Sequence, residues 1–287
     1  MQAQAKIEDQ AALWNGTAGQ AWVDAQALLD DMFRPFEALL AEAAAAGAAP
    51  TARVLDVGCG TGSTTRALAR RLGPKAHCVG VDISQPMIAA ARDLARQQEL
   101  ASTTEFICAD AQRHAFEPGS FDAIVSRFGV MFFDDAVRAF MNLRHAARTN
   151  AGLCFIAWRS AAENPFMTAA ERAAAPLLPS MPARQPNAPG QFGFADERRV
   201  GQILAQSGWT DVGIQALDVV CTLPEKDLLT YLSRLGPLGR VLHLFDERTR
   251  RQVVEVARAA FDPFVHGQQV RYTAACWMVS ARAPAAS

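Results

Sequence analysis

The clearest sign of a ligand site in this 287-residue chain is a hydrophobic run that leads into a glycine-rich turn. The segment reads VLDVGCGTG over residues 54–62. Glycines let the backbone approach a ligand closely and adopt positive φ angles. We therefore expect a cofactor at this turn, although a glycine loop alone does not say which one, because nicotinamide and flavin enzymes use a similar turn.

Two features of the turn narrow the choice of ligand. Its glycines are spaced as Gly58, Gly60 and Gly62, and Ser63 stands where the dinucleotide fingerprint has its third glycine. In addition, Asp56 lies inside the predicted strand just before the turn. A carboxylate there offers nothing to a pyrophosphate, whereas it attracts a ligand that carries an ammonium and a sulfonium. The alternative is a structural carboxylate that caps the loop amides.

Two further acids follow predicted strands. Asp82 comes 20 residues after Gly62, where a carboxylate accepts hydrogen bonds from both hydroxyls of a ribose. Asp110 follows the next strand, where a carboxylate accepts the exocyclic amino group of an adenine. The carboxyl ends of consecutive parallel strands are where ligands bind open α/β sheets. The alternative for Asp82 is an ordinary acid at a helix start. Ser84 is equally suited to contact the ligand and to be the N-cap of that helix.

The elements that position these acids alternate regularly. Short apolar, β-branched runs predict strands, and the segments between them have helical spacing; the strands are 53–57, 77–81, 104–108, 121–126 and 152–158, and the helices 61–72, 85–99 and 134–147. This alternation predicts parallel pairing in a doubly wound, Rossmann-like α/β fold. Residues 211–222 and 269–281 predict two late strands, which complete a mostly parallel seven-stranded sheet with an antiparallel last strand.

The remaining segments predict helical lids. Residues 1–50 form an N-terminal helical lid segment, and residues 51–287 form the main domain with insertions at about 159–195 and 223–267. Five prolines within 176–193 predict a loop there, because proline does not fit a helix interior. The second insertion is apolar and helical over 225–262 and is expected to cover the carboxyl edge of the sheet. The alternative is a dimerisation surface, which would make the protein a homodimer.

Several motifs of the chain together resemble those of a known family. VLDVGCGTG, VDIS with Met87, ADAQ at 109–112 and FDAIVSRFGVMFF at 121–133 are similar to class I S-adenosylmethionine-dependent methyltransferases, of the group that resembles ubiquinone/menaquinone C-methyltransferases. The resemblance covers about residues 50–160 strongly. It implies S-adenosylmethionine as cofactor, S-adenosylhomocysteine as product, and methyl transfer to a small, hydrophobic or aromatic acceptor.

The resemblance also implies roles for individual residues. The methionine end of the cofactor would lie against Asp56, Gly58, Cys59 and Gly60, with the backbone of Ser126 facing it. The nucleoside end would lie against Asp82 at the ribose, Ile83 and Met87 at the faces of the adenine, and Asp110 and Ala111 at its edge. Trp14, near Gly16, Gly19 and Trp22, would fold over the cofactor from the N-terminal segment.

The acceptor pocket is expected to contain Arg127, Phe128, Met131 and Phe132. Arg127 either pairs with Asp134 or Asp135 at the next helix or holds a carboxylate or enolate of the acceptor. Methyl transfer from a sulfonium is a direct displacement, so the protein mainly supplies alignment and desolvation. No residue is marked by its sequence context as a catalytic base, and the catalytic residues stay unassigned.

Composition excludes several function classes. With 28 Lys and Arg against 29 Asp and Glu, the net charge is −1, which disfavours a nucleic-acid binder. The sequence shows neither an apolar run of about 18 residues nor a secretory leader, so we expect no membrane span and a cytoplasmic protein. Six cysteines without a CxxC pair predict reduced thiols and no metal site. The alternatives are a non-catalytic cofactor-binding regulatory or partner protein, or an NAD-dependent oxidoreductase.

Overall fold

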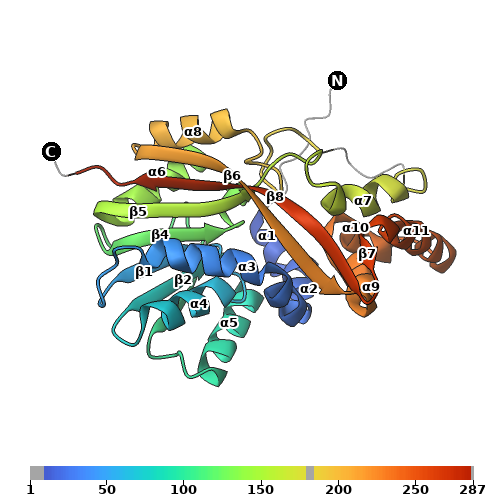
Figure 1. Cartoon of the computed structure of the whole chain (residues 1–287), viewed down its shortest axis with the longest axis horizontal. Coiled ribbons are helices and arrows are strands. Elements are labelled where there is room, and N and C mark those ends of the chain that lie inside the picture. The colour runs from blue at the N-terminus through green and yellow to red at the C-terminus, as the bar shows by residue number, and fades with distance from the viewer. Residues whose placement is uncertain (1–9, 179–183, 286–287) are drawn as a thin grey trace.

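A single mixed sheet organises the protein, as the computed structural model shows for residues 10–178 and 184–285 (Figure 1). The strands stand in the order β3-β2-β1-β4-β5-β8-β6, and β7 (Val265–His266) pairs with β8. Their bounds are β1 Arg53–Val57, β2 His77–Asp82, β3 Thr104–Cys108, β4 Phe121–Arg127, β5 Ala147–Trp158, β6 Thr210–Pro224 and β8 Gln269–Arg282. The first five strands are parallel and β8 is antiparallel to both of its neighbours. The doubly wound fold with an antiparallel last strand is confirmed.

Helices cover both faces of this sheet (Figure 1). On one face lie α3, α4 and α5, and on the other α6 and α8; their bounds are α3 Gln26–Ala45, α4 Ser63–Leu72, α5 Gln85–Gln97, α6 Ala136–Ala146 and α8 Glu197–Gln206. The helix expected from residue 61 begins at Ser63, because Gly62 takes a left-handed conformation with φ 79°. The apolar faces of these helices and the sheet form the core of the domain.

The predicted lid segments are helical. The N-terminal segment forms α1 (Gln10–Asn15) and α2 (Thr17–Asp24) ahead of α3. The second insertion, at about 223–267, which we call the late insertion, forms α9 (Leu228–Arg234), α10 (Gly236–Val241) and α11 (Glu247–Ala259). Short 3-10 turns lie at Val130–Phe132, Glu225–Asp227, Leu242–Leu244 and Asp262–Phe264. The sequence missed α7 (Pro165–Ala174) in the first insertion and the short strand β7. The proline-rich stretch has no helix or strand where the structure describes it, and its residues 179–183 lie outside the described part.

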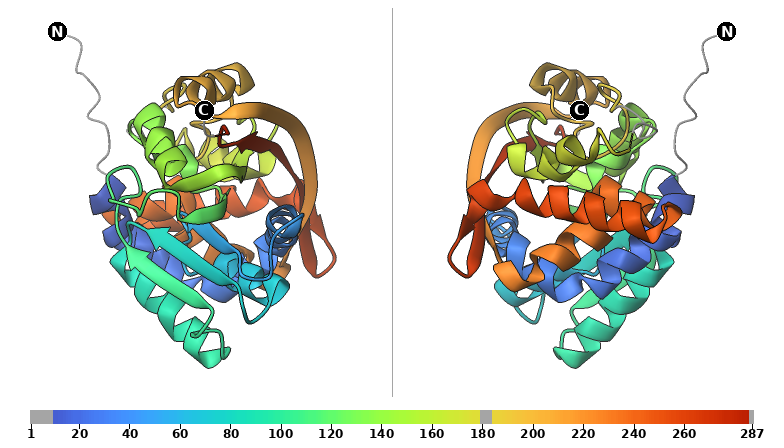
Figure 2. Two further views of the ribbon diagram at one scale, coloured as in Figure 1. Left: turned by 90° about the vertical axis from the view of Figure 1, so that its left-hand side faces the viewer. Right: turned by 90° about the vertical axis from the view of Figure 1, so that its right-hand side faces the viewer.

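A two-stranded ribbon carries the late insertion. The pairing of β5 with β8 ends at Trp158 and Cys276, whereas the pairing of β6 with β8 continues to Pro224 and Gln269. The two strands therefore project beyond the carboxyl end of β5 and hold α9, α10 and α11 at their tip (Figures 1 and 2). This extension places the insertion beyond the edge of the sheet where the predicted cofactor residues lie.

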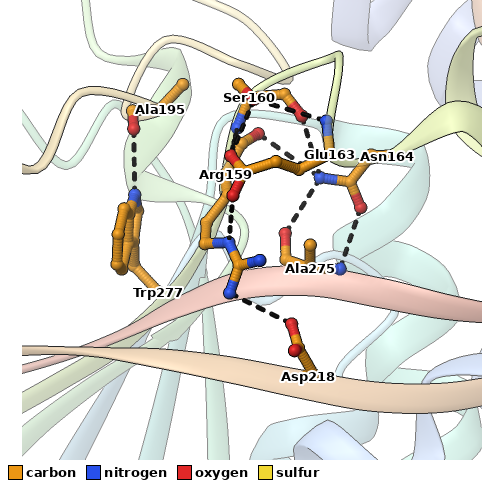
Figure 3. A network of polar contacts seen from close by, with 8 residues as sticks. All are labelled: Arg159, Ser160, Glu163, Asn164, Ala195, Asp218, Ala275 and Trp277. Carbon is orange, nitrogen blue, oxygen red and sulfur yellow. Dashed lines mark hydrogen bonds and ion pairs between the residues drawn. The ribbon is translucent and has the colours of Figure 1, made fainter.

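The point where the ribbon leaves the sheet is fixed by a polar network (Figure 3). The side-chain amide of Asn164, which is 1% exposed, donates to the carbonyl of Ala275 and accepts from its N–H, both at 2.9 Å. Asn164 thus satisfies the N–H of Ala275, whose carbonyl also accepts from the N–H of Arg159 at 3.0 Å, as a buried backbone requires. Arg159 pairs with Asp218 of β6 and with Glu163, each at 3.0 Å (Figure 3). Both strands of the ribbon are therefore tied to the segment that leads into α7.

Candidate functional site

A cavity of about 1090 Å³ lies at the carboxyl ends of the parallel strands. One half is lined by the segments that follow β1, β2, β3 and β4. We call this the strand-end half; its members include Gly58, Cys59, Gly60, Thr61, Asp82, Ile83, Met87, Asp110, Ala111, Arg127, Phe128 and Met131. The opposite side, which we call the lid half, is lined by α1, α2, α9, α10 and residues 184–193. The fold thus brings four separate parts of the sequence around one space.

The glycine turn after β1 is held by a contact that only glycine allows. Gly58, Gly60 and Gly62 have φ angles of 68°, 55° and 79°. A Cβ on Gly58 would lie 2.6 Å from the Cα of Gly129, and a Cβ on Gly129 would lie 2.6 Å from the carbonyl oxygen of Val57. The turns after β1 and β4 therefore pack backbone against backbone. The need for glycine at 129 was not foreseen from the sequence.

Asp82 connects the glycine turn to the loop that follows β2. One of its carboxylate oxygens accepts from the N–H of Gly60 at 2.8 Å, and the other accepts from the N–H of Ser84 at 2.9 Å. Burial raises the pKa of Asp82, while these backbone hydrogen bonds act in the opposite direction. The carboxylate lines the cavity at the same time, so it is available to a ligand on the cavity side.

Asp56 lies behind the cavity wall rather than in it. Its side chain is 1% exposed, and one oxygen accepts from the hydroxyl of Thr65 at 2.6 Å. The other oxygen has no hydrogen-bond partner among the described residues. Burial raises the pKa of Asp56 to about 6, against the lowering effects of Thr65 and Arg127. Direct contact between Asp56 and a cofactor stays a prediction; the carboxylate is placed to act through its charge.

Of the remaining predicted cofactor residues, some line the cavity and one is buried away from it. Ile83, Met87, Asp110 and Ala111 line the cavity, and Asp110 accepts from the N–H of Gln112 at 2.9 Å. Ser126 is buried, and its hydroxyl donates to the carbonyl of Val57 at 2.7 Å. Ser126 therefore braces β4 against β1, and it is not among the lining residues. Cofactor binding by these residues stays a prediction.

The six cysteines are unpaired thiols. Cys59 lines the cavity, but burial raises its pKa well above the usual value, so the thiol stays protonated. Cys108 is exposed at the end of β3. No group of three His, Cys, Asp or Glu side chains among residues 10–178 and 184–285 is arranged to hold a metal ion.

Arg127 has a partner that the sequence did not suggest. Its guanidinium pairs with Glu37 of α3 at 2.9 Å, and both side chains are largely buried. The expected pairing with Asp134 or Asp135 is wrong: Asp135 instead caps α6 by accepting from the N–H of Arg138. The reason is that α3 packs across the end of β4, which brings a carboxylate from 90 positions away within reach.

Aromatic side chains form part of the cavity wall. Phe128 has a positive φ of 63°, which is strained for a bulky residue, and its ring stacks on Trp158 with a centroid distance of 4.5 Å. Phe132 meets Trp14 edge to face at 5.3 Å. The aromatic residues that line the cavity are Trp14, Trp22, Phe33, Phe128, Phe132, Phe133, Trp158, Phe192 and Tyr231. The sequence analysis assigned the segments of Phe33 and Tyr231 to the lids but singled out neither residue, and it did not place Trp158 or Phe192 at the cavity, because these segments meet only in the folded chain.

Part of this sequence matches a known protein family. Residues 54–150 match the family described as methyltransferase domain. This part of the chain is therefore similar in sequence to methyltransferase domains. The match contains the glycine turn, Asp82, Asp110 and the aromatic segment after β4.

The curated relatives share the same region. A chloroplastic tocopherol O-methyltransferase of Arabidopsis thaliana is 34% identical over 106 residues, which are 37% of this chain and 30% of the relative. A ubiquinone/menaquinone biosynthesis C-methyltransferase of Ectopseudomonas mendocina is 34% identical over 100 residues, which are 34% of this chain and 39% of the relative. The chain thus matches about a third of the length of these relatives.

Solved structures extend the fold comparison beyond the matched domain. Phosphoethanolamine N-methyltransferase 2 of Haemonchus contortus, solved in complex with S-adenosyl-L-methionine, aligns with 95% of this chain and 59% of its own. The TM-score is 0.59 at 15% sequence identity, so this likeness shows the fold alone. Within the described residues, no helix has the length and apolar character needed to cross a membrane.

Proposed function

We propose that the protein transfers the methyl group of S-adenosylmethionine to a small, hydrophobic or aromatic acceptor. The observation that carries this proposal is the position of Asp82, which binds the glycine turn through the N–H of Gly60 and faces the cavity. Asp110 lines the same cavity from the next strand. Carboxylates at these two strand ends fit the ribose and the adenine of one nucleoside.

The residues present suit this cofactor at its other end as well. Gly58, Cys59 and Gly60 offer a backbone surface to the methionine end. The buried carboxylate of Asp56 behind them attracts a ligand that carries an ammonium and a sulfonium, and its unpaired oxygen is consistent with such a role. The cofactor supplies an activated methyl group on sulfur; the protein binds it, orients it and excludes water.

The acceptor occupies the remaining, aromatic part of the cavity in this proposal. Phe128, Met131 and Phe132 form its wall on the strand side, and Tyr231, Leu235 and Val241 form its wall on the insertion side. A concave, mostly apolar space suits a small hydrophobic or aromatic molecule rather than a nucleic acid. Arg127 is engaged with Glu37, so we assign it the role of holding α3 in place rather than that of an acceptor anchor.

The lid segments complete the proposal. Residues 1–50 act as an N-terminal lid, residues 51–287 form the methyltransferase domain, and the insertions at about 159–195 and 223–267 roof the cavity and move for entry of the acceptor. Tyr231 and Arg234 of the late insertion line the cavity, which supports this assignment. The free thiols of the six cysteines support a cytoplasmic location. A homodimer formed through the late insertion is the rival use of that surface.

Calorimetry with S-adenosylmethionine and S-adenosylhomocysteine, in the presence of a metal chelator, tests the cofactor. We expect both to bind, and the absence of heat with either, or tight binding of NAD instead, contradicts the proposal. Release of S-adenosylhomocysteine with a panel of phenols, quinols, aromatic acids and amines then tests catalysis. A protein that binds the cofactor and methylates none of these classes is better explained as a non-catalytic partner.

A further inference from the structure

The corner between α1 and α2 directs a backbone carbonyl at the loop that follows β2. A Cβ on Gly19 would lie 1.9 Å from the carbonyl oxygen of Trp14, so the two helices meet at a distance that only glycine permits. The hydroxyl of Ser84 donates to this carbonyl at 2.6 Å. The corner is therefore bound to a loop 70 positions further along the chain.

Asn15 makes a second, two-sided connection to the same loop. Its amide nitrogen donates to the carbonyl of Ile83 at 3.0 Å, and its amide oxygen accepts from the N–H of Gln85 at 2.8 Å. Gln85 is the first residue of α5, and the N–H groups of a first helical turn have no partner within the helix. Asn15 thus caps α5 from a distant part of the sequence.

The loop bound in this way contains the groups assigned to the nucleoside. Asp82 holds it from the sheet side through the N–H groups of Ser84 and Gly60. Trp14 and Asn15 hold it from the opposite side, and Trp14, Thr17 and Ala18 line the cavity next to it. The α1–α2 pair is therefore both a wall of the cavity and a support for the loop that carries Asp82.

We infer that Asn15 is a positioning residue that latches the α1–α2 pair onto this loop and controls how fast the cofactor exchanges. The inference rests on the proposed function, because it takes the ligand at Asp82 to be S-adenosylmethionine or its product. Asn15 is exposed, so its hydrogen bonds compete with water and open more readily than buried ones. Opening of the latch withdraws Trp14 from the cavity, and a bound cofactor leaves by this route.

The test measures dissociation of S-adenosylhomocysteine by stopped-flow fluorescence, since Trp14 and Trp22 line the cavity and report on it. We expect Asn15→Ala to raise the dissociation rate and the Kd by about fivefold, with a fall in Tm of no more than about a few degrees from the lost helix cap. Asn15→Asp keeps an acceptor for Gln85 at a helix N-terminus and loses the donor to Ile83, so we expect a smaller increase. Gln20→Ala is the matched control, because Gln20 is an exposed amide that bonds Asp24 within α2.

The outcomes separate the latch from the proposed function. If both Asn15 variants bind S-adenosylhomocysteine and release it at the wild-type rate, the latch is wrong and the proposed function stands. If Tm falls while the release rate does not change, Asn15 is only structural and the latch is again wrong. If the wild-type protein binds neither ligand, the proposed function fails and the latch fails with it. Hydrogen exchange of residues 10–24 adds an independent readout: the ligand should protect them in the wild type and less so in Asn15→Ala.

Discussion

The strand-end half and the lid half of the cavity are built by different means. In the strand-end half, backbone groups and carboxylates stand at fixed short distances, as in the contact of Gly58 with Gly129 and the bond from Gly60 to Asp82. In the lid half, aromatic and aliphatic side chains such as Trp22 and Tyr231 supply apolar area. Close backbone contacts tolerate no added side-chain atom, whereas an apolar side chain can often be replaced by another of similar volume. We therefore expect cofactor affinity to depend mainly on the glycine turn and its carboxylates, and acceptor choice to depend mainly on the late insertion.

The two halves also differ in how they are anchored. The strand-end half continues directly from paired strands, so its position follows from the register of β1, β2 and β4. The late insertion is joined to the sheet by the ribbon of β6 and β8. Asn164 and Arg159 fix the point where this ribbon leaves the sheet (Figure 3). We expect substitutions in the glycine turn or at Asp82 to cost folding or cofactor binding, and substitutions in the late insertion to alter the acceptor.

The largest effect is expected for Gly129→Ala. The new Cβ would overlap the carbonyl of Val57 and the Cα of Gly58, and neither backbone can move without disturbing β1. We expect a loss of about 3 kcal/mol in the free energy of unfolding, or failure to fold. Gly152→Ala is the control, since a Cβ there meets no atom within 4 Å. Chemical denaturation of both variants gives the comparison, and equal stabilities would show that the two turns are not in rigid contact.

The second effect concerns pH and Asp56. Its pKa is raised from 3.8 to about 6 in the folded protein, so the folded state binds this proton more tightly than the unfolded state does. Stability from this group is therefore complete below about pH 4 and is lost as the pH rises through 6, by about 3 kcal/mol in total. Asp56→Asn lacks this dependence, so its stability relative to the wild type should increase between pH 4 and 7.5. Denaturation at several pH values measures the difference, and a difference that stays constant contradicts the raised pKa.

Asp82→Ala should separate cofactor binding from folding. The variant loses the acceptor of the Gly60 and Ser84 N–H groups and the proposed bonds to the ribose. We expect binding of S-adenosylhomocysteine to weaken by about 1.5–3 kcal/mol, the scale for hydrogen bonds to a charged group, with the fold intact. Calorimetry is the measurement and Asp93→Ala, an exposed carboxylate on α5, is the control. Unchanged affinity would make Asp82 a loop-stabilising acid only.

Tyr231→Ala should show the reverse pattern. The ring lies in the lid half and packs on Phe166 and Phe261, so its removal should cost about 2 kcal/mol of stability. We expect the affinity for S-adenosylhomocysteine to stay within about twofold, because the ring and hydroxyl of Tyr231 contact Phe166, Met167 and Phe261, while the kcat/KM for any accepted methyl acceptor falls. Equal losses of cofactor and acceptor binding would mean that the two halves are not separable.

The smallest effect is expected at the outer surface of the late insertion. Leu229 and Leu244 are 51% and 71% exposed, so replacing both with serine should change stability by less than about 0.5 kcal/mol. If the insertion serves as a roof, sedimentation of the double variant should match that of the wild type. A shift from dimer to monomer would favour the rival assignment of this surface as a dimer interface.

Local patterns alone determined the strand-end half. The residues of VLDVGCGTG predict a strand and a tight turn by themselves, and alternating strands and helices require parallel pairing. Because parallel strands end at the same edge, Asp82 and Asp110 had to lie near one another, and both line the cavity. This reasoning needed no long-range information, which is why it also located the glycine turn correctly.

The tertiary structure alone decided the partners that come from distant segments. The pairing of Arg127 with Glu37, the stacking of Phe128 on Trp158 and the capping of α5 by Asn15 join residues that no local pattern relates. The length of the β6–β8 ribbon likewise depends on where β5 stops pairing, which Asn164 and Ala275 set through buried hydrogen bonds. Strand and turn propensities act between neighbours in sequence, whereas ion pairs, ring contacts and strand ends depend on which surfaces packing brings together.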